Sequence, residues 1–395
     1  MTKLIDITGK AKSGEWGTDD DIGNGIPVLR TTNFTYTGKI NFNDVITRTI
    51  KKKNIDDKYL RKGDIIIEKS GGSDRFPVGR VIYFDGEDYK YLFNNFTGLL
   101  RVQDKEKWYP KYVLYSLLAN YNRGGTRRFE NKTTGLHNLK IDDYVKKFDV
   151  KDVTYADQIN ISIQLDKLDE IICKYNEELK MLDVLIKSRF VEMFGTLHDN
   201  ENKFDIVTIE EVCSLIKDGT HQTPQYTEDK EEGYKFLSSK DVMSQKIDWS
   251  EIKYIPADLH EKLYATIKPQ RNDILMSKNG VNYGVAAVND TDETFDIYVS
   301  LALLRPKKMI EPIFFRCVIN NPETKRQFDS SIKGVGVPNL HLGEIKKTRI
   351  FLPPMKFQKE FVSFVEQVDK SKFEIQKSLD KLQLLFDSLM QEYFG

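Results

Sequence analysis

The residues best placed to do chemistry are two carboxylates and a lysine in the segment GDIIIEKSG. Asp64 and Glu68 could hold a metal ion while Lys69 stabilises charge, which is a residue set of many nucleases. A second copy of this segment, NDILMSKNG, keeps Asp273 and Lys278 but has serine in place of the glutamate. A nuclease built from two equivalent halves would keep its catalytic residues in both. We therefore interpret the segment as a strand that enters a turn.

Other catalytic patterns are missing from the sequence. There is no GxxxxGK[ST] motif that would bind a nucleotide phosphate. The tetrapeptides NNPE at 320–323 and LPPM at 352–355 lack the Asn/Asp-Pro-Pro-aromatic order of an amino-methyltransferase. The five histidines show no metal-ligand spacing, and the three cysteines are far apart and show no CxxC pair. We predict no active site, no metal site and no disulfide.

The composition is that of a folded protein without excess charge. Hydrophobic residues make up 39% of the 395 residues, a length that fits two domains and their connectors. Lys plus Arg equals Asp plus Glu at 60 each, so nucleic-acid binding would depend on local patches or on other subunits. The sequence has no signal peptide and no run of about 18 apolar residues. We expect a cytoplasmic protein without a membrane span.

The chain repeats itself at a spacing of about 200 residues. Residues 165–195 align without a gap on residues 365–395, both segments end in Phe-Gly, and Gln158 recurs as Gln358. Upstream, matching segments keep the same order: GDIIIEKSG with NDILMSKNG, TGLLRV with LALLRP, and GLHNLKIDDYVKKFDV with GVPNLHLGEIKKTRIFLP. We predict a tandem pair of homologous halves.

Each half ends in an amphipathic segment whose apolar residues are spaced alternately four and three apart. Arg189 interrupts the apolar seam of the first copy, and Lys372 interrupts that of the second. Each helix would be about 50 Å long and must bury its seam. Folding back on its own domain is the commoner arrangement, but matching seams favour pairing of the two helices. The predicted coiled-coil core comprises Leu165, Leu168, Ile172, Leu179, Leu182, Val365, Val368, Leu379, Leu382 and Phe386.

The globular parts contain short β-branched and aromatic runs separated by Gly, Asn and Asp, which predict an antiparallel sheet. Segments that begin at Pro110 and Pro312 are predicted helices with proline in the first turn. The predicted fold class is α+β, with two homologous mixed α/β domains separated by two long helices that form an antiparallel coiled coil. The predicted boundaries are 1–157 and 196–357 for the globular domains, and 158–195 and 358–395 for the helices.

Two basic loops recur at corresponding places in the halves. EKSGGSDRFPVGR and NRGGTRRFENK in the first half correspond to SKNGVNYG and TKRQFDSSIKGVG in the second. Glycine lets the backbone approach a ligand, Lys and Arg hold phosphates, and Ser, Asn and Arg can bind base edges. A solvated turn explains each loop alone equally well. Their recurrence in both halves favours binding.

Three segments and both helix endings carry a family resemblance. The segments are GTHQTPQYTEDKEEGYKFLSSKDV at 219–242, NDILMSKNG at 272–280 and GVPNLHLGEIKKTRIFLPPMKFQKEF at 336–361, and the helices end in Phe-Gly at 195 and 395. Together they resemble the DNA-specificity subunit of type I restriction-modification enzymes, over essentially the whole chain. The first half departs from the pattern, because GLHNLKIDDYVKKFDV lacks the Pro-Pro of FLPPMKFQ.

The resemblance implies a non-catalytic subunit without a cofactor of its own. Each globular part would be a target-recognition domain for one half of a bipartite, asymmetric sequence in double-stranded DNA, and the helices would fix an unread spacer. Two methyltransferase subunits that use S-adenosylmethionine would dock on the helices, and restriction (translocase) subunits that use ATP and Mg would complete the nuclease. The alternative is a non-enzymatic two-domain adaptor that binds protein partners through its coiled coil.

The paired positions of the basic loops give a hypothesis for the DNA contacts. It names five residues in the first half and three in the second: Lys69, Ser70, Arg75, Arg127, Arg128, Lys278, Asn279 and Lys333.

Overall fold

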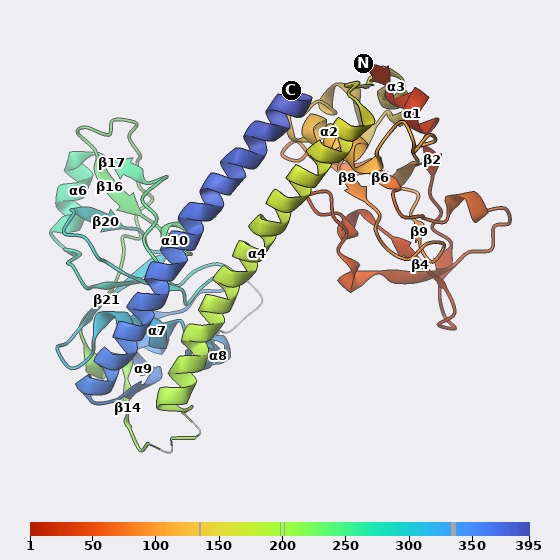
Figure 1. Cartoon of the computed structure of the whole chain (residues 1–395). Helices are drawn as coiled ribbons and strands as arrows, with labels where there is room; N and C mark the ends of the chain where they lie inside the picture. The colour runs from red at the N-terminus through yellow and green to blue at the C-terminus, as the bar shows by residue number, and fades with distance from the viewer. Residues whose placement is uncertain (134–135, 198, 201, 333–336) are drawn as a thin grey trace. The chain divides into compact units, whose positions relative to one another are not determined.

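The computed structural model describes residues 1–133, 136–197, 199–200, 202–332 and 337–395 (Figure 1). The chain divides into two compact units. Unit 1 comprises Met1–Asn176 with Lys377–Gly395, and unit 2 comprises Glu177–Gln376. The boundaries fall inside the two long helices, so each unit contains one globular part and a segment of both helices. No helix among the described residues is long and apolar enough to cross a membrane.

The globular part of unit 1 is built on a four-stranded antiparallel sheet in the order β2-β10-β6-β8. A second four-stranded sheet, β3-β5-β4-β9, and a three-stranded sheet, β11-β12-β7, extend it. The strands are β1 (Thr2–Lys3), β2 (Lys12–Ser13), β3 (Thr18–Asp19), β4 (Ile26–Leu29), β5 (Ile46–Thr49), β6 (Ile65–Glu68), β7 (Ser70–Gly72), β8 (Val81–Tyr83), β9 (Leu92–Phe93), β10 (Thr97–Leu100), β11 (Glu130–Thr133), β12 (Leu136–Leu139) and β13 (Asp149–Val150). The helices are α1 (Leu4–Thr8), α2 (Pro110–Asn122) and α3 (Ile141–Lys147).

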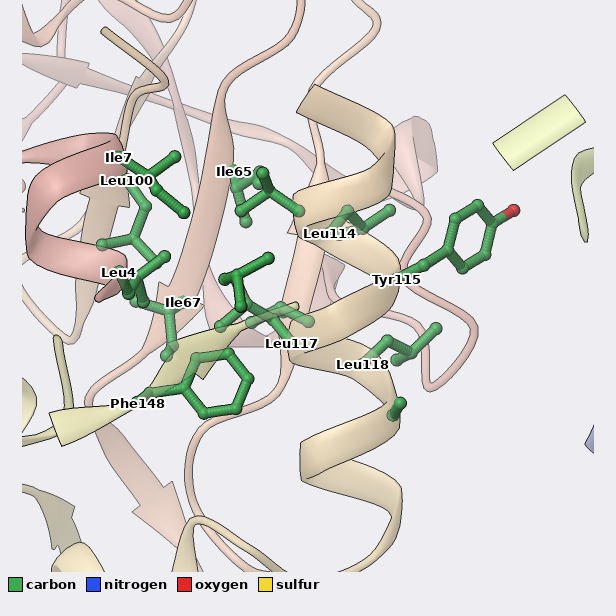
Figure 2. Packing of buried hydrophobic residues seen from close by; sticks show 14 of the residues in the cluster. Leu4, Ile7, Ile65, Ile67, Leu100, Leu114, Tyr115, Leu117, Leu118 and Phe148 are labelled. Carbon is green, nitrogen blue, oxygen red and sulfur yellow. The ribbon is translucent and has the colours of Figure 1, made fainter. Parts of the chain in front are cut away.

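The main core of unit 1 lies between α1, strands β6 and β10, and α2 (Figure 2). Ile65 and Ile67 face this core, whereas Ile66 points into a separate cluster on the other side of the sheet, as the two-residue period of a strand requires. Tyr115 of α2 points away from the strands (Figure 2), and its hydroxyl donates to Asp166 of the first long helix at 2.8 Å. Helix α2, which is buried along most of its length, therefore joins the sheet to the long helix.

Unit 2 repeats the main sheet of unit 1. Its main sheet has the equivalent order β15-β21-β18-β19, and in each unit one pair of strands is parallel, β4 with β9 and β16 with β20. The strands are β14 (Asp205–Thr208), β15 (Cys213–Asp218), β16 (Tyr234–Leu237), β17 (Lys253–Ile255), β18 (Ile274–Ser277), β19 (Ala286–Val288), β20 (Phe295–Ile297), β21 (Leu301–Pro306) and β22 (Arg349–Leu352). The helices are α5 (Ile209–Val212), α6 (Ala257–Tyr264), α7 (Pro312–Ile319), α8 (Pro322–Ser331) and α9 (Leu342–Lys347). The predicted pair of homologous mixed α/β domains is confirmed, as are the helices that start at Pro110 and Pro312.

The long helices are α4 (Tyr155–Phe194) and α10 (Met355–Phe394), each of 40 residues. Both begin three residues before the predicted ranges. In α4 the earlier start is explained by a cap, because the Thr154 hydroxyl accepts a hydrogen bond from the backbone of Asp157 at 3.1 Å.

The two helices pair antiparallel, as predicted (Figure 1). In unit 1 the Tyr393 hydroxyl donates to the Gln164 side chain at 2.9 Å. In unit 2 each of the two residues that interrupt the apolar seams forms an ion pair with a carboxylate of the facing helix. Lys372 pairs with Asp183 at 2.5 Å and Arg189 with Glu360 at 3.7 Å. A seam position can therefore hold a cation because the facing helix supplies a carboxylate.

The residues of the predicted coiled-coil core are the less exposed positions of each helix. Leu165 and Val365 are fully buried, and Val368 is buried. Half-buried positions are Leu168, Ile172, Leu179, Leu182, Leu379, Leu382 and Phe386. The helices also fold back on the globular parts, because Leu165 belongs to the core of unit 1 and Val365 to that of unit 2. The two arrangements weighed from the sequence thus coexist.

The phenylalanine of each recurring Phe-Gly ending packs in the same way in both units. Phe194, at the end of α4, packs against Phe314 of α7 with ring centroids 5.2 Å apart. Phe394, at the end of α10, packs at the same distance against Tyr112, which aligns with Phe314 in the repeat. Each helix end therefore completes the core of the globular part that belongs to the other half of the sequence.

A buried glutamine joins each long helix to its globular part. The side chain of Gln158 accepts from the backbone of Tyr109 at 2.8 Å and donates to the carbonyls of Lys107 and Val153. Gln358 makes the equivalent three hydrogen bonds, accepting from Glu311 and donating to the carbonyls of Met309 and Pro353. The glutamine that recurs in the sequence therefore anchors each long helix to its globular part by the same three hydrogen bonds.

Replacing Gln358 with alanine should lower the free energy of unfolding by about 3 kcal/mol, because it leaves buried backbone groups without partners. The measurement is urea unfolding followed by circular dichroism, with Gln383→Ala as the control at an exposed position of the same helix. Equal unfolding midpoints for the two variants would contradict the role of Gln358.

Candidate nucleic-acid interface

The carboxylates of the nuclease-like segment are bound by arginines. Asp64 accepts two hydrogen bonds from Arg101, at 2.7 and 2.6 Å, and Glu68 accepts two from Arg80, at 3.0 and 2.9 Å. Both carboxylates are at most 2% exposed. The hydrogen bonds that Arg80 donates to Glu68 raise the pKa of Arg80, which keeps the guanidinium protonated. Among the described residues, no group of three or more His, Cys, Asp or Glu side chains could hold a metal ion.

The strand pairing brings the two basic loops of unit 1 together. Strand β7, which follows the first loop's lysine, pairs with β12, and β12 pairs with β11, which follows the second loop. The Arg127 guanidinium donates to the backbone carbonyls of Asp74 and Arg75 at 3.1 and 3.5 Å. We call the surface formed by the exposed side chains of Arg75, Arg127 and Arg128 the basic edge of unit 1.

The other two predicted contacts in unit 1 lie beside this edge and are less exposed. The Ser70 hydroxyl is hydrogen-bonded to Asn138 of β12. Lys69 is half-buried, and its ammonium donates to the Ser13 hydroxyl at 3.0 Å and to the Asn95 carbonyl at 3.2 Å. Burial lowers the pKa of Lys69. The structure therefore gathers all five predicted residues of unit 1 around one three-stranded sheet.

Two aromatic residues at the basic edge escaped the sequence interpretation. Tyr36 and Phe76 are 52% and 45% exposed, and their ring centroids lie 5.5 Å apart. The Arg80 guanidinium lies 5.1 Å from the Tyr36 ring, and that of Arg75 lies 5.2 Å from the Phe76 ring. The sequence feature that could have identified them is a single aromatic residue within each of two polar segments. That signal is too common to identify a pair separated by 40 residues.

The predicted residues of unit 2 lie in different surroundings. Lys278 is 4% exposed, and its ammonium forms an ion pair with Asp218 at 2.6 Å, so in this conformation it is not available to a phosphate. Asn279 is half-buried and forms a backbone bridge with Asn339. Lys333 lies outside the described residues. The most exposed apolar side chain of this loop is Val281, at 83%.

We predict that duplex-DNA affinity falls more steeply with pH for the wild-type chain than for Lys69→Arg. Because burial lowers the pKa of Lys69 below its ordinary 10.5, its positive charge is lost earlier as pH rises, whereas arginine stays protonated. Fluorescence anisotropy between about pH 7 and about pH 9.5 measures the difference. Parallel pH curves for the two proteins would show that Lys69 does not contribute to DNA binding.

Comparisons with known proteins show which family and which solved structures the chain is similar to. Residues 201–384 match the family model described as type I restriction modification DNA specificity domain. The type I restriction enzyme MjaVIII specificity subunit of Methanocaldococcus jannaschii is 22% identical over 335 residues, which cover 76% of each chain.

Two solved structures share the fold over the whole of this chain. The type I restriction-modification S subunit from M. genitalium has a TM-score of 0.57 at 16% identity, with 95% of that chain covered. A chain from a structure that describes complex assembly and conformational transition of a type I restriction-modification system has a TM-score of 0.55 at 15% identity, with 96% covered.

Proposed function

Because this chain belongs to the family of DNA specificity subunits of type I restriction-modification systems, we propose that it recognises a bipartite DNA sequence and directs its partner subunits to it. Each unit would be a target-recognition domain that binds one half-site. The observation that carries the proposal is the repeat itself, since two units with the same strand order in their main sheets present different exposed side chains from corresponding loops.

The differences between the loops support an asymmetric target. Unit 1 presents Arg75 and Phe76 from the loop after β6, whereas unit 2 presents Val281 and keeps Lys278 in an ion pair. Guanidinium groups hydrogen-bond to phosphates and to guanine, whereas a valine offers only apolar contact. The two half-sites should therefore differ in sequence.

The basic edge of unit 1 supports contact with the DNA backbone. Arg128 is exposed beside the Phe129 ring, at 4.8 Å, and Arg127 fixes the neighbouring loop through two backbone carbonyls. The chain as a whole has no net charge. Partner subunits would then supply part of the phosphate contact, as sequence-independent affinity depends on the number of cations at the duplex.

The long helices support the docking of two identical partners. Leu185 and Leu385 occupy equivalent positions of the repeat and are 45% and 47% exposed, and Val184 and Leu384 beside them are also exposed. Equivalent apolar patches on two helices suit two copies of one subunit. We assign these patches to two methyltransferase subunits that use S-adenosylmethionine.

The chain itself would take no part in catalysis. The carboxylates that resemble catalytic residues are bound by arginines. Restriction subunits with ATP and Mg would complete the nuclease. The uninterrupted α4 and α10, which contribute to both units, would fix the number of unread bases between the half-sites.

The proposal is tested by mapping N6-methyladenine across the genome of cells that express this chain with a type I methyltransferase subunit. We expect a new methylated motif of two short, different blocks separated by unread bases. Cells that lack the chain, but contain the same methyltransferase with another specificity subunit, are the control. Active methyltransferase without any chain-dependent motif would instead favour the adaptor function.

The docking assignment predicts a stepwise loss of partners. Leu185→Glu or Leu385→Glu alone should leave one bound methyltransferase subunit, and the double variant none, because each carboxylate would be buried in one interface. Native mass spectrometry counts the subunits, and Lys167→Glu, at an exposed position of α4, should retain both. Retention of two subunits by both single variants would contradict the assignment.

A further inference from the structure

We propose that Tyr36 and Phe76 form an apolar base contact that selects a thymine, through its 5-methyl group, in the half-site bound by unit 1. This inference rests on the proposed function of unit 1 as a DNA reader. It adds a base preference to that function.

The exposure of the two rings is the first observation. Among the residues that the structure describes, Tyr36 and Phe76 are the aromatic contact pair in which both rings are exposed. Phe236, by contrast, is buried beneath its exposed partner Tyr226. Large apolar side chains gathered on a surface commonly mark a binding site. An apolar ligand group would remove both rings from water.

Both rings are held in place before any ligand binds. Arg80, which is fixed by Glu68, donates to the carbonyls of Thr31 and Phe34 at 3.2 and 3.3 Å and lies over the Tyr36 ring. These contacts fix the segment that carries Tyr36. A rigid contact loses little conformational entropy on binding and favours one shape of ligand.

The turn that carries Phe76 is fixed in the same way. The backbone of Ser73 donates to the Phe76 carbonyl at 2.7 Å, and the Phe76 amide donates to the Ser73 hydroxyl at 3.1 Å. Arg127 binds the two carbonyls inside this turn. The guanidinium groups of the basic edge would therefore bring this apolar surface to DNA with its geometry already set.

Thymine is the base whose chemistry suits this surface. Its 5-methyl group is the apolar group that the bases present in the major groove, and phenylalanine is one of the side chains that contact it. The two exposed rings lie 5.5 Å apart, so the pair presents one continuous apolar surface and not a single protruding side chain. A base-step wedge would require such a protrusion.

The preference belongs to unit 1. In the corresponding loop of unit 2 the aromatic residue Tyr283 is 8% exposed and donates its hydroxyl hydrogen to Asp329 at 2.5 Å. Lys325 covers that ring at 3.6 Å. The aromatic ring in this loop of unit 2 is therefore covered and cannot contact a base. We expect no aromatic contact with a thymine in the half-site of unit 2.

The test uses duplexes that carry the methylated motif, with each thymine of the unit 1 block replaced in turn by deoxyuridine, which lacks the methyl group. Binding of the assembled methyltransferase is measured by fluorescence anisotropy. At one position, deoxyuridine should weaken wild-type binding about fourfold, the effect of leaving one methyl group unburied. Phe76→Ala and Tyr36→Ala should bind both duplexes equally, whereas Tyr36→Phe should retain the preference.

Tyr89→Ala is the matched control. Tyr89 is 56% exposed and lies under Arg61 at 4.8 Å, as Tyr36 lies under Arg80, but its ring is not part of the Tyr36–Phe76 pair, so the preference for thymine should remain. A wild-type complex that binds its motif without discriminating deoxyuridine at any position overturns the inference and leaves the proposed function standing. Failure to bind any motif duplex rejects the proposed function itself.

A wedge mechanism gives a different result. If 2-aminopurine in the unit 1 block becomes fluorescent on binding and Phe76→Ala abolishes that change, the ring separates a base step. That outcome also overturns the methyl contact.

Discussion

The structure depends on an exchange of helix ends between the halves of the sequence. Phe190 and Phe194, at the end of α4, lie in the core of unit 2, and Met390 and Phe394, at the end of α10, lie in the core of unit 1. Neither core is complete without a segment from the other half. Burial of these side chains also brings α4 and α10 together, so the coiled coil and the two domains stabilise one another.

The heptad spacing was sufficient to predict both helices and their pairing, but not which residues close the domain cores. The seam spacing of α4 leads from Ile186 through the interrupting Arg189 to Met193, whereas Phe190 and Phe194 lie beside this line. A periodic pattern identifies the apolar face of a helix. It does not identify the element that covers this face, because that depends on contacts between distant segments.

In the candidate interface, too, local sequence patterns predicted some features, whereas contacts between residues far apart in the sequence could not be predicted. The recurrence of basic loops gave the hypothesis that Lys69 and Arg127 contact the same half-site. It did not predict the contact between the two loops, which the pairing of β7 with β12 and the hydrogen bond from Arg127 to the Asp74 carbonyl bring together. The ion pair of Lys278 with Asp218 could not be predicted, because it joins residues 60 positions apart in the sequence. Tyr36 and Phe76 become a surface only when Arg80 and Arg127 fix their loops.

The exchanged helix ends resemble a domain-swapped dimer whose two copies have been joined in one polypeptide. In a dimer of identical chains, any change in a loop would appear in both copies. Joining the copies removes this restriction, provided that each half keeps the helix end required by the other core. Phe194 and Phe394 have remained the same while the loops around Phe76 and Val281 have diverged. The covalent link therefore allows the exposed loops of each unit to change without changing those of the other unit.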